Sequence, residues 1–170
     1  MGNIKESLLN GMQGIAFGLV EGIIFVLGLS LGISALNSSP LMVFVIALTG
    51  GIADAFANSV GFFVSEEVES EQGIAKHSKK EVFTAALLVF IATILFIFIT
   101  ITPYLFVSIG SARIASMAIG LLLLFGFGAY HATQSKESRL FEGLKFAFYG
   151  LLASIICYFI GSQLPGLFLA

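Results

Sequence analysis

Charged residues are scarce in this sequence. Asp, Glu, Lys and Arg make up 11% of its 170 residues, whereas they make up about 25% of a typical soluble domain. So few charges cannot cover the surface of a soluble domain of this length. Hydrophobic residues reach 58%, and the mean hydropathy is +1.03. Lipid must therefore solvate most of the outside of the folded chain, which makes membrane lipid an expected partner.

Cysteine is nearly absent, and so are the motifs of several functional classes. The single cysteine, Cys157, lies in a hydrophobic run, so it cannot form an intrachain disulfide, and we interpret it as apolar filler. A basic stripe and an aromatic RNA-binding pattern are both missing, so nucleic acid is not an expected partner. His131 is the other unusual side chain, but no catalytic triad spacing or zinc motif includes it. We therefore do not expect an enzyme.

Five hydrophobic stretches are long enough to cross a bilayer as helices. A transmembrane helix needs about 20 mostly apolar residues. The runs are continuous rather than alternating, which favours helices over the strands of an outer-membrane barrel. We predict an all-α integral membrane protein with one five-helix domain over residues 1–170. The predicted spans are at about residues 11–36, 41–65, 82–104, 113–133 and 141–164.

The basic residues are distributed unequally between the two sides of the predicted bundle. If the N-terminus is cytosolic, Arg113 is the one basic residue on the outside. Cytosolic segments of membrane proteins are enriched in Lys and Arg. We therefore predict a cytosolic N-terminus and an external C-terminus, in a multi-pass protein of the cell membrane. The remaining basic residues, all inside in this orientation, are Lys5, Lys76, Lys79, Lys80, Lys136, Arg139 and Lys145.

Two of the ten acidic residues, Glu21 and Asp54, fall in the middle of the first and second predicted spans. An ionised side chain at the centre of a transmembrane helix costs at least about 2.5–3.5 kcal/mol. The usual compensation is a Lys or Arg at the same depth, and the predicted spans contain none there. These carboxyl groups must therefore be satisfied by bound cations, protons, water or hydrogen-bonding neighbours.

Asn58 lies four residues after Asp54, on the same face of the second predicted helix. Hard cations prefer carboxylate and amide oxygens as ligands. We therefore predict a metal or proton pathway that contains Glu21, Asp54 and Asn58. The alternative is structural: both carboxyl groups stay protonated, because burial disfavours their charged form, and donate hydrogen bonds across helices.

Glycines at a spacing of four surround Glu21, and acidic residues follow the second span. Such glycine rows allow close approach between helices, so we expect Glu21 beside a tight helix contact, within one subunit or between two. The acidic cluster can concentrate cations at the inner mouth of a pathway, or it is a solvated helix end. The glycines are Gly14, Gly18, Gly22, Gly28 and Gly32, and the acidic residues are Glu66, Glu67, Glu69 and Glu71.

Several stretches resemble the vacuolar iron transporter family. Residues 18–24 (GLVEGII) and 29–35 (LSLGISA) are similar to the first-helix signature of that family. Residues 51–65 (GIADAFANSVGFFVS) resemble its second-helix motif. The segments 102–105 and 143–161 are similar to its third and fifth helices. The resemblance extends over essentially the whole chain, and its two N-terminal motifs are the most specific.

The resemblance implies a homodimer of five-helix subunits that exports divalent iron or manganese from the cytosol in exchange for protons. It gives Glu21 the role of the pathway carboxylate, with no resident cofactor. Asn58 stands where many members carry Met, and Asp54 where a small residue is usual. Replacing a thioether with an amide beside a carboxylate makes a site harder, so another hard cation such as magnesium also fits. The loop after the second span lacks the long acidic domain of plant members.

Two functional hypotheses follow. In the first, the protein is a divalent metal transporter, an antiporter that carries Fe²⁺, Mn²⁺ or another hard cation out of the cytosol. In the second, it is a non-transporting membrane scaffold or assembly protein, held together by hydrogen bonds of its buried carboxyl groups. Glu21 and Asp54 distinguish the two, because only the transporter requires them to exchange a cation for protons.

Overall fold

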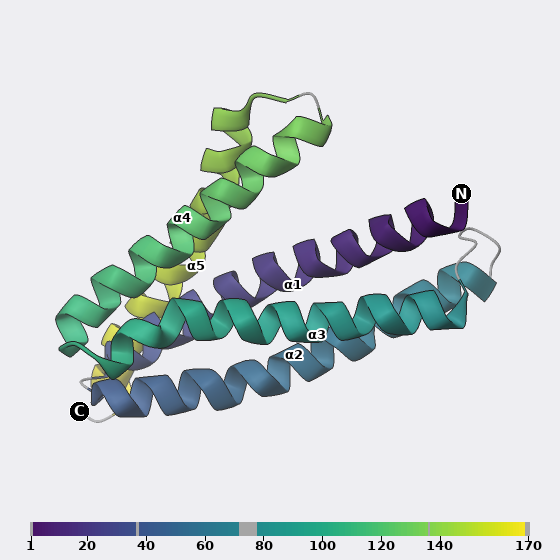
Figure 1. The fold of residues 1–170 in the computed structure, drawn as a ribbon. Coiled ribbons are helices and arrows are strands. Elements are labelled where there is room, and N and C mark those ends of the chain that lie inside the picture. Colours follow the sequence, from purple (N-terminus) through teal and green to yellow (C-terminus); the bar gives the residue numbers. More distant parts are fainter. Residues whose placement is uncertain (1, 37, 72–77, 136, 169–170) are drawn as a thin grey trace. The chain divides into compact units, whose positions relative to one another are not determined.

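The computed structural model describes residues 2–36, 38–71, 78–135 and 137–168. These residues form helices and their connections, and no strand occurs among them (Figure 1). The all-α prediction is therefore confirmed. The elements are α1 (Gly2–Ser34), α2 (Pro40–Glu71), α3 (Lys79–Ile101), the short 3₁₀ helix η1 (Thr102–Leu105), α4 (Ile109–Ser135) and α5 (Arg139–Phe168).

Within the described residues, five helices are long and apolar enough to cross a membrane, which confirms the predicted class of multi-pass membrane protein. Their outer faces remain apolar: Phe106, Leu122 and Ile114 are each more than two-thirds exposed, as expected for side chains that contact lipid. Lys76 and Lys136, two of the basic residues used to predict the orientation, lie outside the described residues. The candidate spans are Met12–Ser34, Pro40–Glu69, Lys79–Leu105, Ile109–Thr133 and Arg139–Leu164.

The helix ends differ by a few residues from those predicted by hydropathy, because polar capping groups set several of them. The α3 helix begins at Lys79 rather than near residue 82, since Ser78 and Glu81 form a capping box. The Ser78 backbone N–H donates to Glu81 Oε2 at 2.9 Å, and the Glu81 N–H donates to Ser78 Oγ at 3.3 Å. At the other end, α3 stops at Ile101 and η1 follows, because Pro103 has no backbone N–H to donate a helical hydrogen bond.

The helices group into two compact units. Each of α1, α2 and α3 is divided between them, with one part in unit 1 and the other in unit 2. Unit 1 comprises Met1–Gly22 and Gly51–Phe96. Unit 2 comprises Ile23–Gly50 and Ile97–Ala170, and therefore includes all of α4 and α5. The carboxyl groups of Glu21 and Asp54 belong to unit 1.

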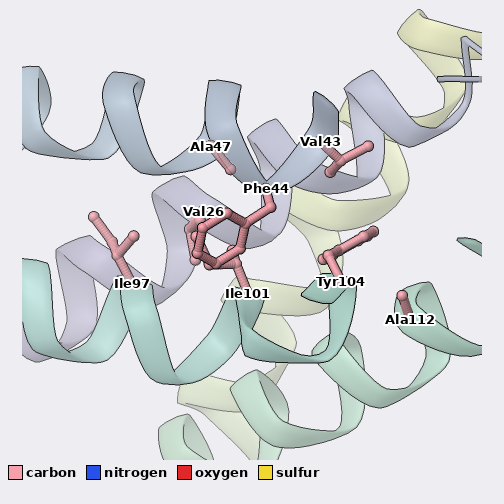
Figure 2. Close-up of a cluster of buried hydrophobic side chains, with 8 residues drawn as sticks. All are labelled: Val26, Val43, Phe44, Ala47, Ile97, Ile101, Tyr104 and Ala112. Atoms are coloured by element: carbon pink, nitrogen blue, oxygen red, sulfur yellow. The ribbon is translucent and has the colours of Figure 1, made fainter. Parts of the chain in front are cut away.

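Unit 2 contains a cluster of buried apolar side chains near the α1–α2 connection and η1 (Figure 2). Each of its members is at most 9% exposed. Lipid tails are as apolar as these side chains, so the cluster stabilises the fold through close packing rather than through transfer out of water. Its members are Val26, Val43, Phe44, Ala47, Ile97, Ile101, Tyr104 and Ala112.

Candidate metal site

The three polar residues predicted to line a pathway come together in unit 1. Asp54 and Asn58 lie one turn apart on α2, and Asn58 Nδ2 donates a hydrogen bond of 2.9 Å to Asp54 Oδ2. The Glu21 carboxyl group, from α1, interacts with the carboxyl group of Asp54 and with the side chain of Asn58. All three residues are partly buried. Two carboxyl groups and one amide from two different helices therefore share one location.

The electrostatics of this site are unbalanced. Neither Glu21 nor Asp54 forms an ion pair with a basic side chain in the part of the chain that the structure describes. Two adjacent carboxylates repel each other, so at least one must hold a proton or both must share a cation. Because Asn58 donates through Nδ2, its Oδ1 oxygen is the atom that can bind a cation. The site thus offers two carboxyl groups and one neutral oxygen as ligands.

Glycines bring α1 against α3 beside Glu21. A Cβ atom added at Gly14 would lie 2.6 Å from the backbone oxygen of Ala85. The same addition at Gly18 or Gly22 would lie 2.5 Å and 2.7 Å, respectively, from a backbone oxygen of α3. Only residues without a side chain allow so close a backbone approach. This tight contact lies within one chain, whereas the sequence also allowed a contact between two subunits.

The other two glycines of the predicted row have a different partner. A Cβ atom at Gly28 would lie 3.0 Å from the Sγ atom of Cys157, and one at Gly32 would lie 3.2 Å from the Cys157 backbone oxygen. Both glycines therefore pack against α5 in unit 2. Cys157 is partly buried at this contact. The row of glycines thus divides between α3 and α5, and only its first three members adjoin the candidate site.

Contacts next to Asn58 hold α2 in unit 1. The Ser59 hydroxyl donates a hydrogen bond of 2.7 Å to the Ala86 backbone oxygen of α3. The ring centroids of Phe56 and Phe90 lie 4.5 Å apart, a distance typical of an attractive aromatic pair. Through these contacts α3 supports both of the helices that carry the carboxyl groups.

The predicted acidic cluster occupies the end of α2, in the same unit as the site. Glu66 and Glu67 are partly buried, whereas Glu69 and Glu71 are exposed. Lys79 Nζ lies 3.4 Å from Glu67 Oε1. The four residues do not share one helix face, because Glu67 and Glu71 are four apart while Glu66 and Glu69 lie on another side. The cluster is therefore a charged helix end rather than a single row of ligands.

Glu142, in unit 2, is a buried carboxyl group that sequence reasoning missed. The sequence places it at the edge of a loop, but its side chain is only 6% exposed. Lys145 Nζ lies 2.9 Å from its Oε1 atom, and His131 Nδ1 lies 3.7 Å from Oε2. The spacing of three between Glu142 and Lys145 was the available signal. Unlike Glu21 and Asp54, this carboxyl group has a basic partner within the described part of the chain.

The ligand groups of the candidate site are few. Among residues 2–36, 38–71, 78–135 and 137–168, no three His, Cys, Asp or Glu side chains gather closely enough to hold a metal ion. Glu21 and Asp54, with the Asn58 amide, make a set of only three groups. Hard divalent cations usually take six or more oxygen ligands. These three groups alone therefore do not complete the coordination shell of such a cation.

Comparison with known proteins identifies the family. The uncharacterized protein MJ0645 of Methanocaldococcus jannaschii is 24% identical over 174 residues, which cover 89% of this chain and 91% of that protein. The VIT family matches residues 67–162, more than half of the chain. The matched residues begin after Asn58, so this match does not bear on the three site residues. The chain belongs to the VIT family, the vacuolar iron transporter family that its motifs resemble, whose members transport metal ions across membranes and are not enzymes.

Proposed function

We propose that this protein exports a divalent metal cation from the cytosol along a path that includes Glu21, Asp54 and Asn58. The cation is Fe²⁺, Mn²⁺ or another hard ion. The observation that carries this proposal is the meeting of two carboxyl groups from different membrane-spanning helices with no basic partner among the described residues. A cation between them removes their mutual repulsion and supplies the missing positive charge.

Proton exchange follows from the chemistry of the ligands. A carboxyl group must lose its proton before it binds a metal ion, so metal binding releases protons. Conversely, protons that reach Glu21 and Asp54 from the other side displace the metal. The two carboxyl groups therefore couple metal export to proton uptake, and this protein is an antiporter.

We further propose a homodimer in the cell membrane, with the N-terminus in the cytosol. Glu21, Asp54 and Asn58 supply at most three ligand groups, which leaves the rest of the coordination shell to water or to a second subunit. The distribution of Lys and Arg supports the orientation. In this orientation the acidic end of α2 faces the cytosol, where the exported ions bind first.

Flux into proteoliposomes tests the proposed function. Purified protein is reconstituted, and uptake of Fe²⁺, Mn²⁺, Mg²⁺ and Ca²⁺ is recorded with and without a pH gradient. We expect uptake of at least one ion, accelerated by a gradient that drives protons in the opposite direction. Equal ion uptake in protein-free liposomes would contradict transport by the protein. Uptake that no pH gradient alters would contradict proton exchange.

Neutralising the acidic end of α2 is expected to weaken cation capture without stopping transport. Gln at Glu66, Glu67, Glu69 and Glu71 removes up to four negative charges, so the half-saturating metal concentration should rise several-fold at low ionic strength. In 1 M salt, where charges are screened beyond about 3 Å, the variant and the wild type should agree. If the variant and the wild type had the same half-saturating metal concentration at low salt, the acidic residues would be only a solvated helix end.

The proposed preference of the site for hard cations can be tested by substitutions at Asn58. Replacing Asn58 with Met exchanges an amide oxygen for a thioether, so transport should shift toward softer ions. We expect the ratio of Cd²⁺ to Mn²⁺ uptake to rise in Asn58→Met, measured by competition in the same liposomes. Asn58→Asp, which retains an oxygen ligand, is the matched control and should not raise that ratio. An identical ion preference in both variants would remove Asn58 from the path.

A further inference from the structure

Arg113 lies near the start of α4, and the partners that the structure describes for it in unit 2 are neutral. Arg113 Nε donates to Ser34 Oγ at 2.9 Å, and Nη2 donates to the Ser34 backbone oxygen. The guanidinium carbon lies 5.6 Å from the centroid of the Tyr158 ring. No carboxylate forms an ion pair with Arg113 among the residues described. Within the described residues, this charge therefore has no counter-ion.

Part of the role of Arg113 is structural. Ser34 is the last residue of α1, so its backbone oxygen accepts no hydrogen bond from within the helix. A cation at this helix end also interacts favourably with the helix dipole. These contacts use two of the five N–H groups of the guanidinium. The remaining three, including both N–H groups of Nη1, have no partner among the described residues and can donate to an acceptor from outside the protein.

A groove of about 560 Å³ opens beside Arg113, between α4 and α5, with α1 contributing to its wall. Ser162 and Gln163 line it near the end of α5. Met117, Ile155 and Phe159 line it deeper in the membrane-spanning part. The groove is thus polar and positive at the helix ends and apolar toward the middle of the spans, which is the polarity of a phospholipid.

We propose that this groove binds an anionic phospholipid. The phosphate accepts hydrogen bonds from the free N–H groups of Arg113, which match phosphate oxygens in geometry and charge. Gln163 and Ser162 offer further polar contacts, and an acyl chain lies along Met117, Ile155 and Phe159. A negative headgroup is favoured because it supplies a counter-ion for Arg113, which has none among the described residues. This proposal does not rest on the metal pathway, which lies in unit 1.

Lipid binding to the purified protein tests this assignment. Thermal melting and native mass spectrometry are recorded in detergent with added phosphatidylglycerol or phosphatidylcholine. We expect the wild type to retain phosphatidylglycerol with about a fivefold preference, the effect of one Arg near an anionic lipid. Arg113→Gln, which can still donate to Ser34, should lose the preference. The matched control Arg139→Gln, which changes an exposed basic residue at the start of α5, should keep it.

A second variant tests the groove without changing the charge. Ile155 is 57% exposed, so Ile155→Trp should fill the groove, leave Arg113 in place and abolish retention of phosphatidylglycerol. A wild type without preference, or a preference that survives both Arg113→Gln and Ile155→Trp, overturns the proposal. Disulfide-linked dimers formed by Ile155→Cys in a Cys157→Ala background would also overturn it, because a second copy would then cover the groove.

Discussion

Replacing Glu21 with Gln is expected to abolish metal flux into proteoliposomes while the protein remains folded. Gln has nearly the same shape as Glu but cannot carry the negative charge that binds a divalent cation, nor exchange a proton for it. Loss of a hydrogen-bonding partner of a metal ligand already costs about 10- to 100-fold. We therefore expect flux to fall by at least about 100-fold, and Asp54→Asn should have the same effect. Initial rates of uptake at equal protein-to-lipid ratios measure it.

The matched control is Glu137→Gln, which removes an exposed carboxyl group in the connection between α4 and α5. This variant should transport at the wild-type rate. Melting temperatures with and without metal distinguish the transporter from a scaffold. A transport site predicts metal-dependent stabilisation that Glu21→Gln removes. Unchanged flux in Glu21→Gln would falsify the assignment. Wild-type protein that metal does not stabilise would favour structural hydrogen bonds by Asp54 and Asn58.

Adding a single methyl group at Gly18 or Gly22 is expected to destabilise unit 1. The added Cβ atom would meet a backbone oxygen of α3 at 2.5 Å and 2.7 Å, respectively, and a backbone atom cannot rotate away as a side-chain end can. Overpacking of this kind typically costs about 1–3 kcal/mol. We therefore expect Gly18→Ala and Gly22→Ala to melt at clearly lower temperature in detergent. Glu21, beside Gly22, should shift with α1, so flux should fall as well.

Gly61→Ala is the matched control, because the same methyl group in the same unit meets nothing within 4 Å. Ala favours a helix over Gly by up to about 1 kcal/mol, so Gly61→Ala should melt at the wild-type temperature or slightly above it. The opposite signs of the two effects separate the α1–α3 contact from helix propensity. A Gly22→Ala variant as stable as Gly61→Ala would show that α1 does not approach α3 so closely.

Much of the fold could be predicted without coordinates. Five continuous hydrophobic runs in a chain with 11% charged residues leave few alternatives to a membrane helix bundle. The helix ends were less predictable, because hydropathy does not register the capping box of Ser78 and Glu81 or the point at which Pro103 interrupts hydrogen bonding. Motif resemblance indicated the family, and the match to residues 67–162 confirms it.

The candidate site was only partly predictable. The spacing of Asp54 and Asn58 already places them on one helix face, and their 2.9 Å hydrogen bond agrees with this. Nothing local brings Glu21 to them, because that requires α1 and α2 to pack together. Glu142 is a second case in which local sequence does not predict the environment of a carboxyl group. Its position beside a loop predicts exposure, but packing of α4 on α5 buries it against Lys145 and His131.

The amino-acid sequence by itself determined the membrane-spanning class, the number of helices and the residues that share a helix face, because hydropathy and the 3.6-residue period are local properties. Tertiary structure alone decided which neighbour each face meets. Gly14 and Gly32 point in the same direction on one helix, yet the first packs against α3 and the second against α5. Contacts between distant segments depend on how all the helices fit together, and no local pattern encodes that choice.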